Sequence, residues 1–197
     1  MTRRFNRGPA FWNESGDTAL RKKDFDLAIQ YFEQAIKLDP GYVMAYYNMG
    51  LTYKDKGDYA IAIQNFEKII YLKPDDYEAY NQMGILYSYQ DNDTIAIRNY
   101  EKAIELDPGH GQIHVNLGLT YKDKGDYAKA TQCIEKAIDL DDDYSFIYYI
   151  DLGVVYKDKG DYAKAIQSFD KAIELDPHDD NFTKELIDEE MADMTGK

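Results

Sequence analysis

The sequence predicts an all-α protein built as a linear array of repeated helix pairs. Residues 50–60 recur letter for letter at 118–128, and residues 156–163 repeat the last eight of them. Small residues recur every 34 positions, with one final step of 35, at Gly16, Gly50, Gly84, Gly118 and Gly153. A fixed period of this length is typical of architectures in which each unit packs mainly on its neighbours.

Five units follow from this spacing, and each one is expected to hold two helices. In the second unit, Tyr46, Met49, Gly50 and Tyr53 lie at i, i+3, i+4 and i+7, which is one stripe of a first helix. Gly57 can take the left-handed conformation that ends this helix, Asp58 suits the N-cap of a second helix, and Pro74 cannot continue that second helix. The expected units are 9–42, 43–76, 77–110, 111–144 and 145–179.

Two places depart from the period. In the third unit the turn glycine is absent, and we expect Asp91 or Asn92 to take the left-handed conformation instead, while the aromatic Tyr89 replaces an acid. The fifth unit arrives one residue late, after a loop that lacks proline.

The end of the chain predicts a capping helix over 180–197. Phe182, Leu186, Ile187, Met191 and Met194 fit one face of a helix, and acids fill most other positions. A stack of helices needs an outer unit with a polar outer face. The alternative is a detachable helix that docks on a partner.

The composition excludes several classes of partner. The net charge of −14 and the pI near 4.6 disfavour binding to nucleic acid and to anionic membranes. Residues 1–8 form a basic tail with Arg3, Arg4 and Arg7, which we interpret as solvated rather than as a nucleic-acid arm. Cys133 is the single cysteine, and we find neither a signal peptide nor a membrane span, so we expect a cytoplasmic location.

The five units resemble the tetratricopeptide repeat family. The family's signature residues stand in the first unit as Trp12, Gly16, Ala28, Phe32, Ala35 and Pro40, and in the fourth as Leu117, Gly118, Tyr121, Ala130 and Ala137. The resemblance covers residues 9–179. It implies antiparallel helix pairs stacked into a right-handed superhelical solenoid, with a concave groove lined by the first helix of each pair.

No motif predicts catalysis, a cofactor or a metal. His110 and His114 are four apart, but His114 occupies a helix-packing position and no third ligand is near in sequence. The runs at 91–93 and 141–143 lack the length and the terminal glutamate of an EF-hand calcium loop. We therefore expect a protein that is not an enzyme and that needs no cofactor.

The expected groove carries the candidate binding residues. Asn48, Gln82 and Asn116 form a row of amides, which can donate to and accept from a peptide backbone. Tyr47 and Asn81 lie beside that row, Leu51, Ile85 and Leu119 supply apolar contacts, and Tyr89 marks the interrupted repeat. Three lysines are expected along one edge, where they would favour acidic ligand groups: Lys54, Lys122 and Lys157.

These features predict a scaffold that holds a protein segment, either an extended peptide or a helix, in the groove. We expect a monomer. The alternative is a structural protein that self-associates through its end repeats or its C-terminal helix.

Overall fold

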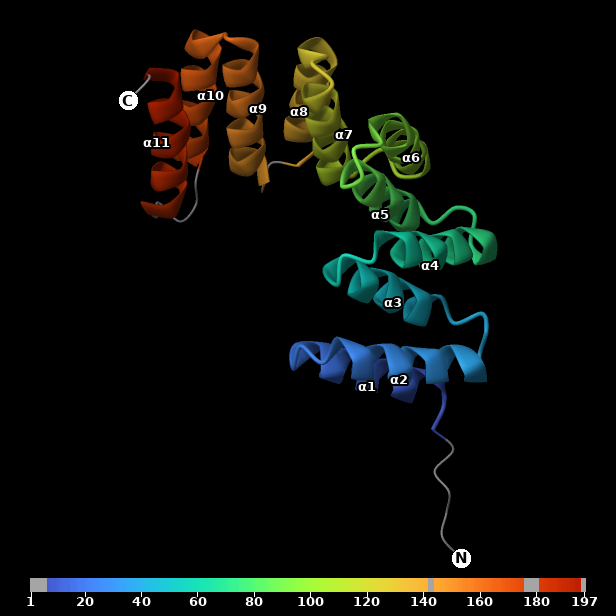
Figure 1. Ribbon diagram of the computed structural model, residues 1–197. Coiled ribbons are helices and arrows are strands. Elements are labelled where there is room, and N and C mark those ends of the chain that lie inside the picture. Colours follow the sequence, from blue (N-terminus) through green and yellow to red (C-terminus); the bar gives the residue numbers. More distant parts are fainter. Residues whose placement is uncertain (1–6, 142–143, 176–180, 196–197) are drawn as a thin grey trace, which may run out of the picture. The chain divides into compact units, whose positions relative to one another are not determined.

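The computed structural model describes residues 7–141, 144–175 and 181–195. Within these ranges the chain forms eleven α-helices and no strand, which confirms the all-α class. The helix pairs α1/α2, α3/α4, α7/α8 and α9/α10 are each joined by a short turn and run antiparallel (Figure 1). The helices are α1 (Pro9–Arg21), α2 (Phe25–Leu38), α3 (Val43–Asp55), α4 (Tyr59–Leu72), α5 (Tyr77–Ser88), α6 (Asp93–Leu106), α7 (Gly111–Asp123), α8 (Tyr127–Leu140), α9 (Ser145–Lys159), α10 (Tyr162–Leu175) and α11 (Asn181–Thr195).

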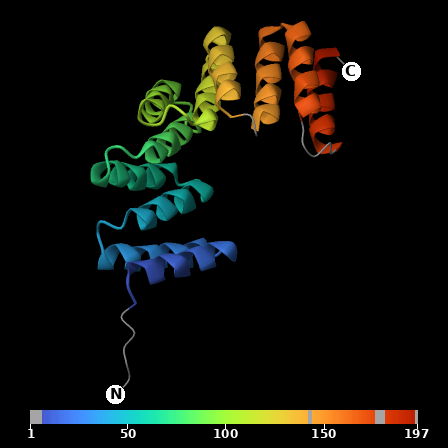
Figure 2. The ribbon, with the colours of Figure 1, turned by 180° about the vertical axis from the view of Figure 1, so that it is seen from behind.

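The chain divides into two compact units, Met1–Leu86 and Tyr87–Lys197, which we call unit 1 and unit 2. In unit 1, α2 packs on both α1 and α3, and α3 packs on α4 (Figure 2). In unit 2, contacts run in sequence order from α6 to α11. First helices also touch each other directly, α1 with α3 in unit 1 and α7 with α9 in unit 2. The right-handed superhelix stays a prediction.

The turns inside the helix pairs follow the expected chemistry. Gly57 has φ +80°, the left-handed conformation that a glycine adopts without a steric penalty. In the third pair Asp91 takes this role with φ +55°, as the sequence predicted. Asp58 is the N-cap residue of α4, although its side chain makes no capping hydrogen bond. The equivalent Asp126 does cap its helix, because its Oδ1 accepts from the backbone N–H of Lys129.

Gly50 shows why the first helix of a pair needs a small residue. A Cβ at Gly50 would lie 2.8 Å from the ring of Phe66 on α4. Phe66 and Ala62 are both fully buried, so the ring has no room to retreat. Glycine and alanine therefore recur every 34 residues because the two helices of a pair need small side chains where they come close.

The helix α11 covers the apolar surface at the end of unit 2. Ile187 is fully buried against Ala165, Phe169 and Ala172 of α10, and Met191 packs on the same cluster. The expected cap positions Phe182, Leu186 and Met194 lie outside the described side chains. The capping role of α11 stays a prediction.

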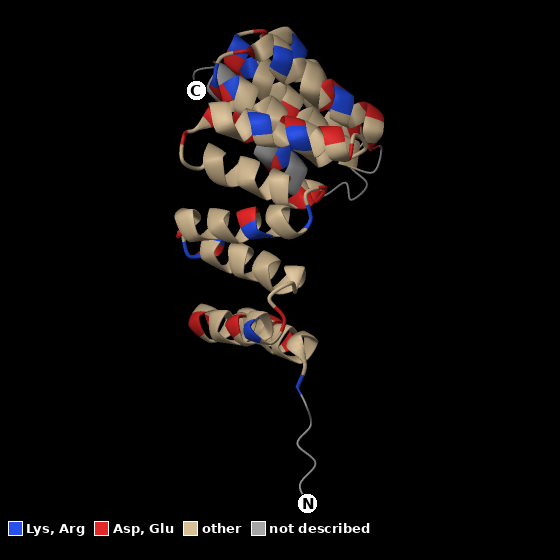
Figure 3. Cartoon of the chain, turned by 90° about the vertical axis from the view of Figure 1, so that its right-hand side faces the viewer, with Lys and Arg blue, Asp and Glu red and all other residues tan. Residues whose placement is uncertain are grey.

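Charge is unevenly spread along the described helices. Charged residues are sparse on α3 and α4, whereas they recur along the helices of unit 2 (Figure 3). Among the described residues, we find no helix with both the length and the hydropathy that a bilayer crossing requires.

Candidate functional site

The first helices of unit 1 present one continuous face, because side chains from α1, α3 and α5 bond across it. We call this surface, formed by α1, α3 and residues 77–86 of α5, the first-helix face of unit 1. Met44, Asn48, Leu51 and Asp55 recur along it at helical spacing on α3. The face holds two hydrogen-bonded clusters.

The first cluster joins α3 to α1 through Asn48. The Nδ2 atom of Asn48 donates to Oδ1 of Asn13 at 3.1 Å and to Oδ1 of Asp17 at 2.9 Å. Asn13 is 6% exposed, so its carbonyl has little access to water as a substitute donor. Burial raises the pKa of Asp17, and the charge of Arg21 opposes that shift. Both N–H groups of Asn48 are thus used within the protein, and a ligand would meet its carbonyl oxygen.

The second cluster joins α3 to α5 through Tyr47 and Lys54. The Tyr47 hydroxyl donates to Oε1 of Glu78 at 2.6 Å and accepts from Nε2 of Gln82 at 3.4 Å. The Lys54 ammonium donates to Oε1 of Gln82 at 3.3 Å. Burial, together with the bond to Glu78, raises the pKa of Tyr47 far above its usual value, so the phenol keeps its proton. The Gln82 amide is thus hydrogen-bonded at both its oxygen and its nitrogen, and the second of its two amide N–H groups stays available to a ligand.

Apolar side chains lie beside these clusters. Leu51 and Ile85 are half-buried, and Met44 is 53% exposed. Asn81 is also half-buried on this face and makes contacts of its own. The face therefore offers apolar surface next to fixed polar groups.

The equivalent face of unit 2 is formed by α7, α9 and α11. Asn116 accepts at Oδ1 from Gln112 Nε2 at 3.2 Å, and Leu119 is half-buried against the core of this unit. Asp151 of α9 stands at the amide position, where burial raises its pKa to about 6 although the charge of Lys122 pulls the pKa down. Tyr89, in the turn after α5, is 59% exposed.

The three lysines expected at the edge all contact neighbouring side chains. Besides the Lys54 bond to Gln82, Lys122 lies 3.4 Å from both Asp123 and Asp158, and Lys157 lies 2.6 Å from Glu190 of α11. An acidic ligand group would have to displace these partners in a chain of net charge −14. The expected preference for acidic ligand groups therefore loses its basis.

Other candidate residues remain ordinary parts of the fold. His114 is half-buried, its Nε2 is 3.3 Å from the carbonyl oxygen of Pro108, and burial lowers its pKa. Burial raises the pKa of the Cys133 thiol to about 11. Among the described residues, no three His, Cys, Asp or Glu side chains gather as a set of metal ligands.

Sequence reasoning did not anticipate that Asn13, Asp17 and Glu78 would act as partners inside the face. Asn13 and Asp17 lie four residues apart on α1, and Asn48 lies 35 residues after Asn13 and 31 residues after Asp17. Polar residues separated by about one repeat length could therefore have indicated a hydrogen bond between first helices. The bond from Tyr47 to Glu78, 31 residues on, has the same separation as the bond from Asp17 to Asn48.

Family models match along the chain. Models described as tetratricopeptide repeat match residues 43–76, 77–110 and 109–178, and a model described as TPR repeat matches residues 16–57. A comparison with curated proteins gave no match.

Solved structures give a similar result. A crystal structure of MamA protein is 30% identical, covers 85% of this chain and 91% of that chain, and has a TM-score of 0.73. A second structure of MamA is 32% identical, with coverage of 81% and 93% and a TM-score of 0.72. TTC0263 from Thermus thermophilus shares the fold at 20% identity, with coverage of 93% and 99% and a TM-score of 0.73.

Proposed function

Because this chain belongs to the tetratricopeptide repeat family, we propose that it is a non-enzymatic scaffold that binds a segment of a partner protein on its first-helix faces. The observation that carries the proposal is the bonding between first helices in unit 1. Asn48 ties α3 to α1, and Tyr47 with Lys54 ties α3 to α5. Side chains that are already fixed lose little conformational entropy when a ligand binds.

The same bonds decide which polar groups meet the ligand. The Asn48 carbonyl oxygen offers an acceptor, and the remaining N–H of Gln82 offers a donor, so an extended backbone finds both kinds of partner. Met44, Leu51 and Ile85 offer apolar contact beside them. In unit 2, Asn116 and Leu119 extend the proposal to the second face.

The charges favour a ligand with basic side chains. Lys122 and Lys157 are paired with acids of this chain, while Glu14 and Asp55 are exposed on the face of unit 1. A net charge of −14 attracts cationic segments and speeds their association at low salt. We include a cytoplasmic location in the proposal, with which the single cysteine, Cys133, is compatible.

Self-association is the second candidate function, and exposed apolar side chains in the last repeat and at the residue just before it favour it. These are Tyr144, Ile147, Tyr162, Ile166 and Leu175, each between 37% and 56% exposed. Light scattering at two protein concentrations separates the two functions, because a scaffold that works alone keeps one mass. A mass that rises with concentration supports self-association.

The groove proposal can be tested without knowing the partner. Random peptides displayed on phage are selected on the purified protein, and the best ones are titrated calorimetrically into two variants. Met44→Asp places a charge on the first-helix face, whereas Ile61→Asp places the same charge on α4, at a residue that is 40% exposed. We expect Met44→Asp to weaken binding at least about tenfold and Ile61→Asp to leave it unchanged, because burying an unpaired charge is costly. Equal affinity for both variants would overturn the proposal.

A further inference from the structure

Asp151 on α9 differs from its counterparts in the three preceding repeats. The same position holds Asn48, Gln82 and Asn116, and each of these amides takes part in a hydrogen bond between side chains. For Asp151, neither a hydrogen bond nor an ion pair is found among the described residues. The side chain is half-buried, so its carboxylate brings acceptor oxygens to the face of unit 2 that this chain does not use.

The preceding first helix explains why this carboxylate has no partner. In unit 1, the amide of Asn48 reaches two polar side chains on α1. The corresponding positions on α7 hold Val115 and Leu119, whose side chains have no hydrogen-bonding group. Burial beside such residues penalises the charged form, and the pKa of Asp151 is accordingly raised to about 6.

Lys122 of α7 does not relieve this penalty. Among the described residues, its ammonium is the charged group that lowers the pKa of Asp151, but burial outweighs it and the pKa stays raised. The ammonium lies 3.4 Å from both Asp123 and Asp158, so two other acids share its charge. Ionised Asp151 would therefore be stabilised by a further cation from outside the chain.

Apolar side chains surround Asp151 on the face formed by α7, α9 and α11. Ile147 lies one turn before it on α9 and is 40% exposed, and the half-buried Val154 lies one turn after it. Leu119 of α7 is also half-buried. The surface thus combines one carboxylate with apolar contact area.

An arginine side chain fits this combination better than other cations do. Its alkyl stem packs on apolar surface, while its guanidinium binds a carboxylate through two parallel hydrogen bonds. A lysine ammonium is more strongly hydrated, which makes it costlier to place among apolar side chains. A calcium ion needs about six to eight oxygen ligands, and the described residues bring no such set of acids together.

We propose that Asp151 binds an arginine side chain of the partner segment, with Ile147, Val154 and Leu119 around the alkyl stem. The inference rests on the proposed binding of a partner segment, and it names one side chain that the segment carries. In the free protein the buried carboxylate lacks a counter-charge, and the bound guanidinium supplies it.

The test uses N-acetylargininamide as the probe and N-acetylcitrullinamide as its uncharged counterpart of similar shape. Methyl NMR follows Ile147 and Leu119, with Ile166 of α10, which is 39% exposed, as the reference. We expect the arginine probe to shift Ile147 and Leu119 with one common affinity, at least about fivefold higher than that of the citrulline probe. Equal affinities of these two probes, shifts that are largest at Ile166, or equally tight binding of N-acetyllysinamide would overturn the proposal.

Two variants of the full chain locate the binding. Asp151→Asn keeps the shape of the side chain and should reduce the affinity for the arginine probe at least about fivefold. The variant is expected to fold, because it removes a charge that burial penalises. The control Asp170→Asn removes the same charge from an exposed position of α10 and should bind as the wild type does. Full binding in Asp151→Asn, or an equal loss in both variants, contradicts the assignment.

The Asp151 carboxyl carbon provides an independent NMR readout. A guanidinium binds the ionised form, so affinity for the arginine probe should rise about tenfold from pH 5 to pH 7, across the pKa of about 6. The probe should also lower that pKa. The other ion pair on this face, Lys157 with Glu190, is internal to the chain.

An affinity that is constant with pH would refute the proposal. So would a pKa of Asp151 below its usual 3.8 in the free protein, because Lys122 would then already be its partner. All these readouts lie in unit 2, whereas the Met44→Asp test of the proposed function lies in unit 1. A failure at Asp151 can therefore be distinguished from a failure of the scaffold function.

Discussion

Replacing Asn48 by alanine should destabilise unit 1, because this amide is the bond between α3 and α1. The substitution removes the donor from Asn13 Oδ1 and from Asp17 Oδ1. Leaving the buried Asn13 carbonyl without a partner costs about 1–3 kcal/mol. Water can replace part of the bond to the half-buried Asp17, and alanine returns about 0.5 kcal/mol of helix propensity. We expect a loss of about 2 kcal/mol in the free energy of unfolding.

The measurement is urea unfolding of the full chain, followed by circular dichroism, with Asn99→Ala as the matched control. Asn99 is also half-buried, but among the described residues its amide donates only to the carbonyl of Ile95 on its own helix. The control should therefore change the free energy of unfolding by less than about 0.5 kcal/mol.

A double-mutant cycle isolates the bond itself. Combining Asn48→Ala with Asp17→Ala should give a coupling energy of at least about 0.5 kcal/mol, as for residues in one hydrogen-bond network. Additive losses, or a loss in Asn48→Ala no larger than that in Asn99→Ala, would refute the reasoning.

Three further outcomes are expected. Ile187→Ala should lower the free energy of unfolding by about 2–4 kcal/mol, because the residue is fully buried. The control Ile166→Ala, at an exposed residue, should not lower it. Equal losses of the two variants in urea unfolding would exclude a capping role for α11. Burial raises the pKa of Asp151 from its usual 3.8 to about 6, so its contribution favours folding below pH 4 and is lost as the pH rises through 6. Asp151→Asn should then be more stable than the wild type at pH 8, by roughly 3 kcal/mol at most, and the difference should vanish near pH 4; a difference that is constant with pH would contradict this. Because burial raises the pKa of the Cys133 thiol to about 11, labelling by a maleimide at pH 7 should be at least about tenfold slower than in urea-unfolded protein, and equal rates would show that the thiol is accessible and ionised.

The repeats could be predicted from the sequence alone because the same packing constraint recurs in every helix pair. Gly50 and Ala62 must be small wherever a large ring such as Phe66 sits between the helices, and such a constraint repeats with the fold. The turn at Asp91 was also predictable, since a short polar side chain tolerates the left-handed conformation.

The candidate site was less predictable, since its geometry depends on bonds between repeats. Asn48 stands where the sequence places it, but only the structure shows that both of its N–H groups are taken by α1. Lys157 similarly faces Glu190 of α11, and the period of the repeats does not extend to that helix. Contacts between neighbouring repeats depend on side-chain rotamers and on how one helix pair packs on the next.

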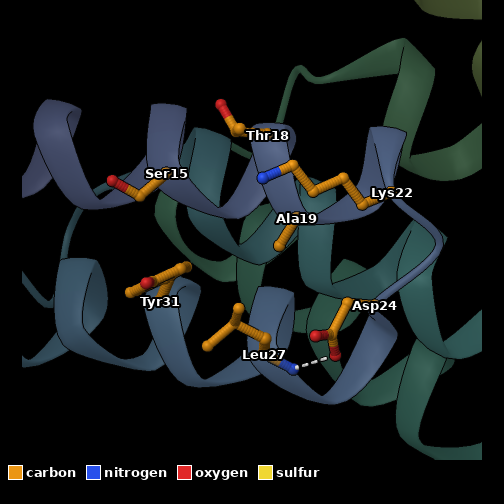
Figure 4. Close-up of a pocket in the computed structure, with 7 residues that line it drawn as sticks. All are labelled: Ser15, Thr18, Ala19, Lys22, Asp24, Leu27 and Tyr31. Atoms are coloured by element: carbon orange, nitrogen blue, oxygen red, sulfur yellow. Dashed lines mark hydrogen bonds between the residues drawn. The ribbon is translucent and has the colours of Figure 1, made fainter.

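A pocket between α1 and α2, lined by residues that include Ala19 and Tyr31, is an intermediate case (Figure 4). Aligned repeats show Ala19 where the other repeats have tyrosine, and Tyr31 where they have smaller residues. The volume that remains open cannot be read from them, because it depends on where the Tyr31 ring packs.

The most direct test of the central claim is a methyl NMR map of a bound peptide selected from the displayed library. Leu51 and Ile85 report on the first-helix face of unit 1, and Ile61 reports on α4 of the same unit. We predict that the peptide shifts the methyl signals of Leu51 and Ile85 with one common affinity and leaves those of Ile61 in place. Shifts that are largest at Ile61, with Leu51 and Ile85 unchanged, would contradict binding on the first-helix face.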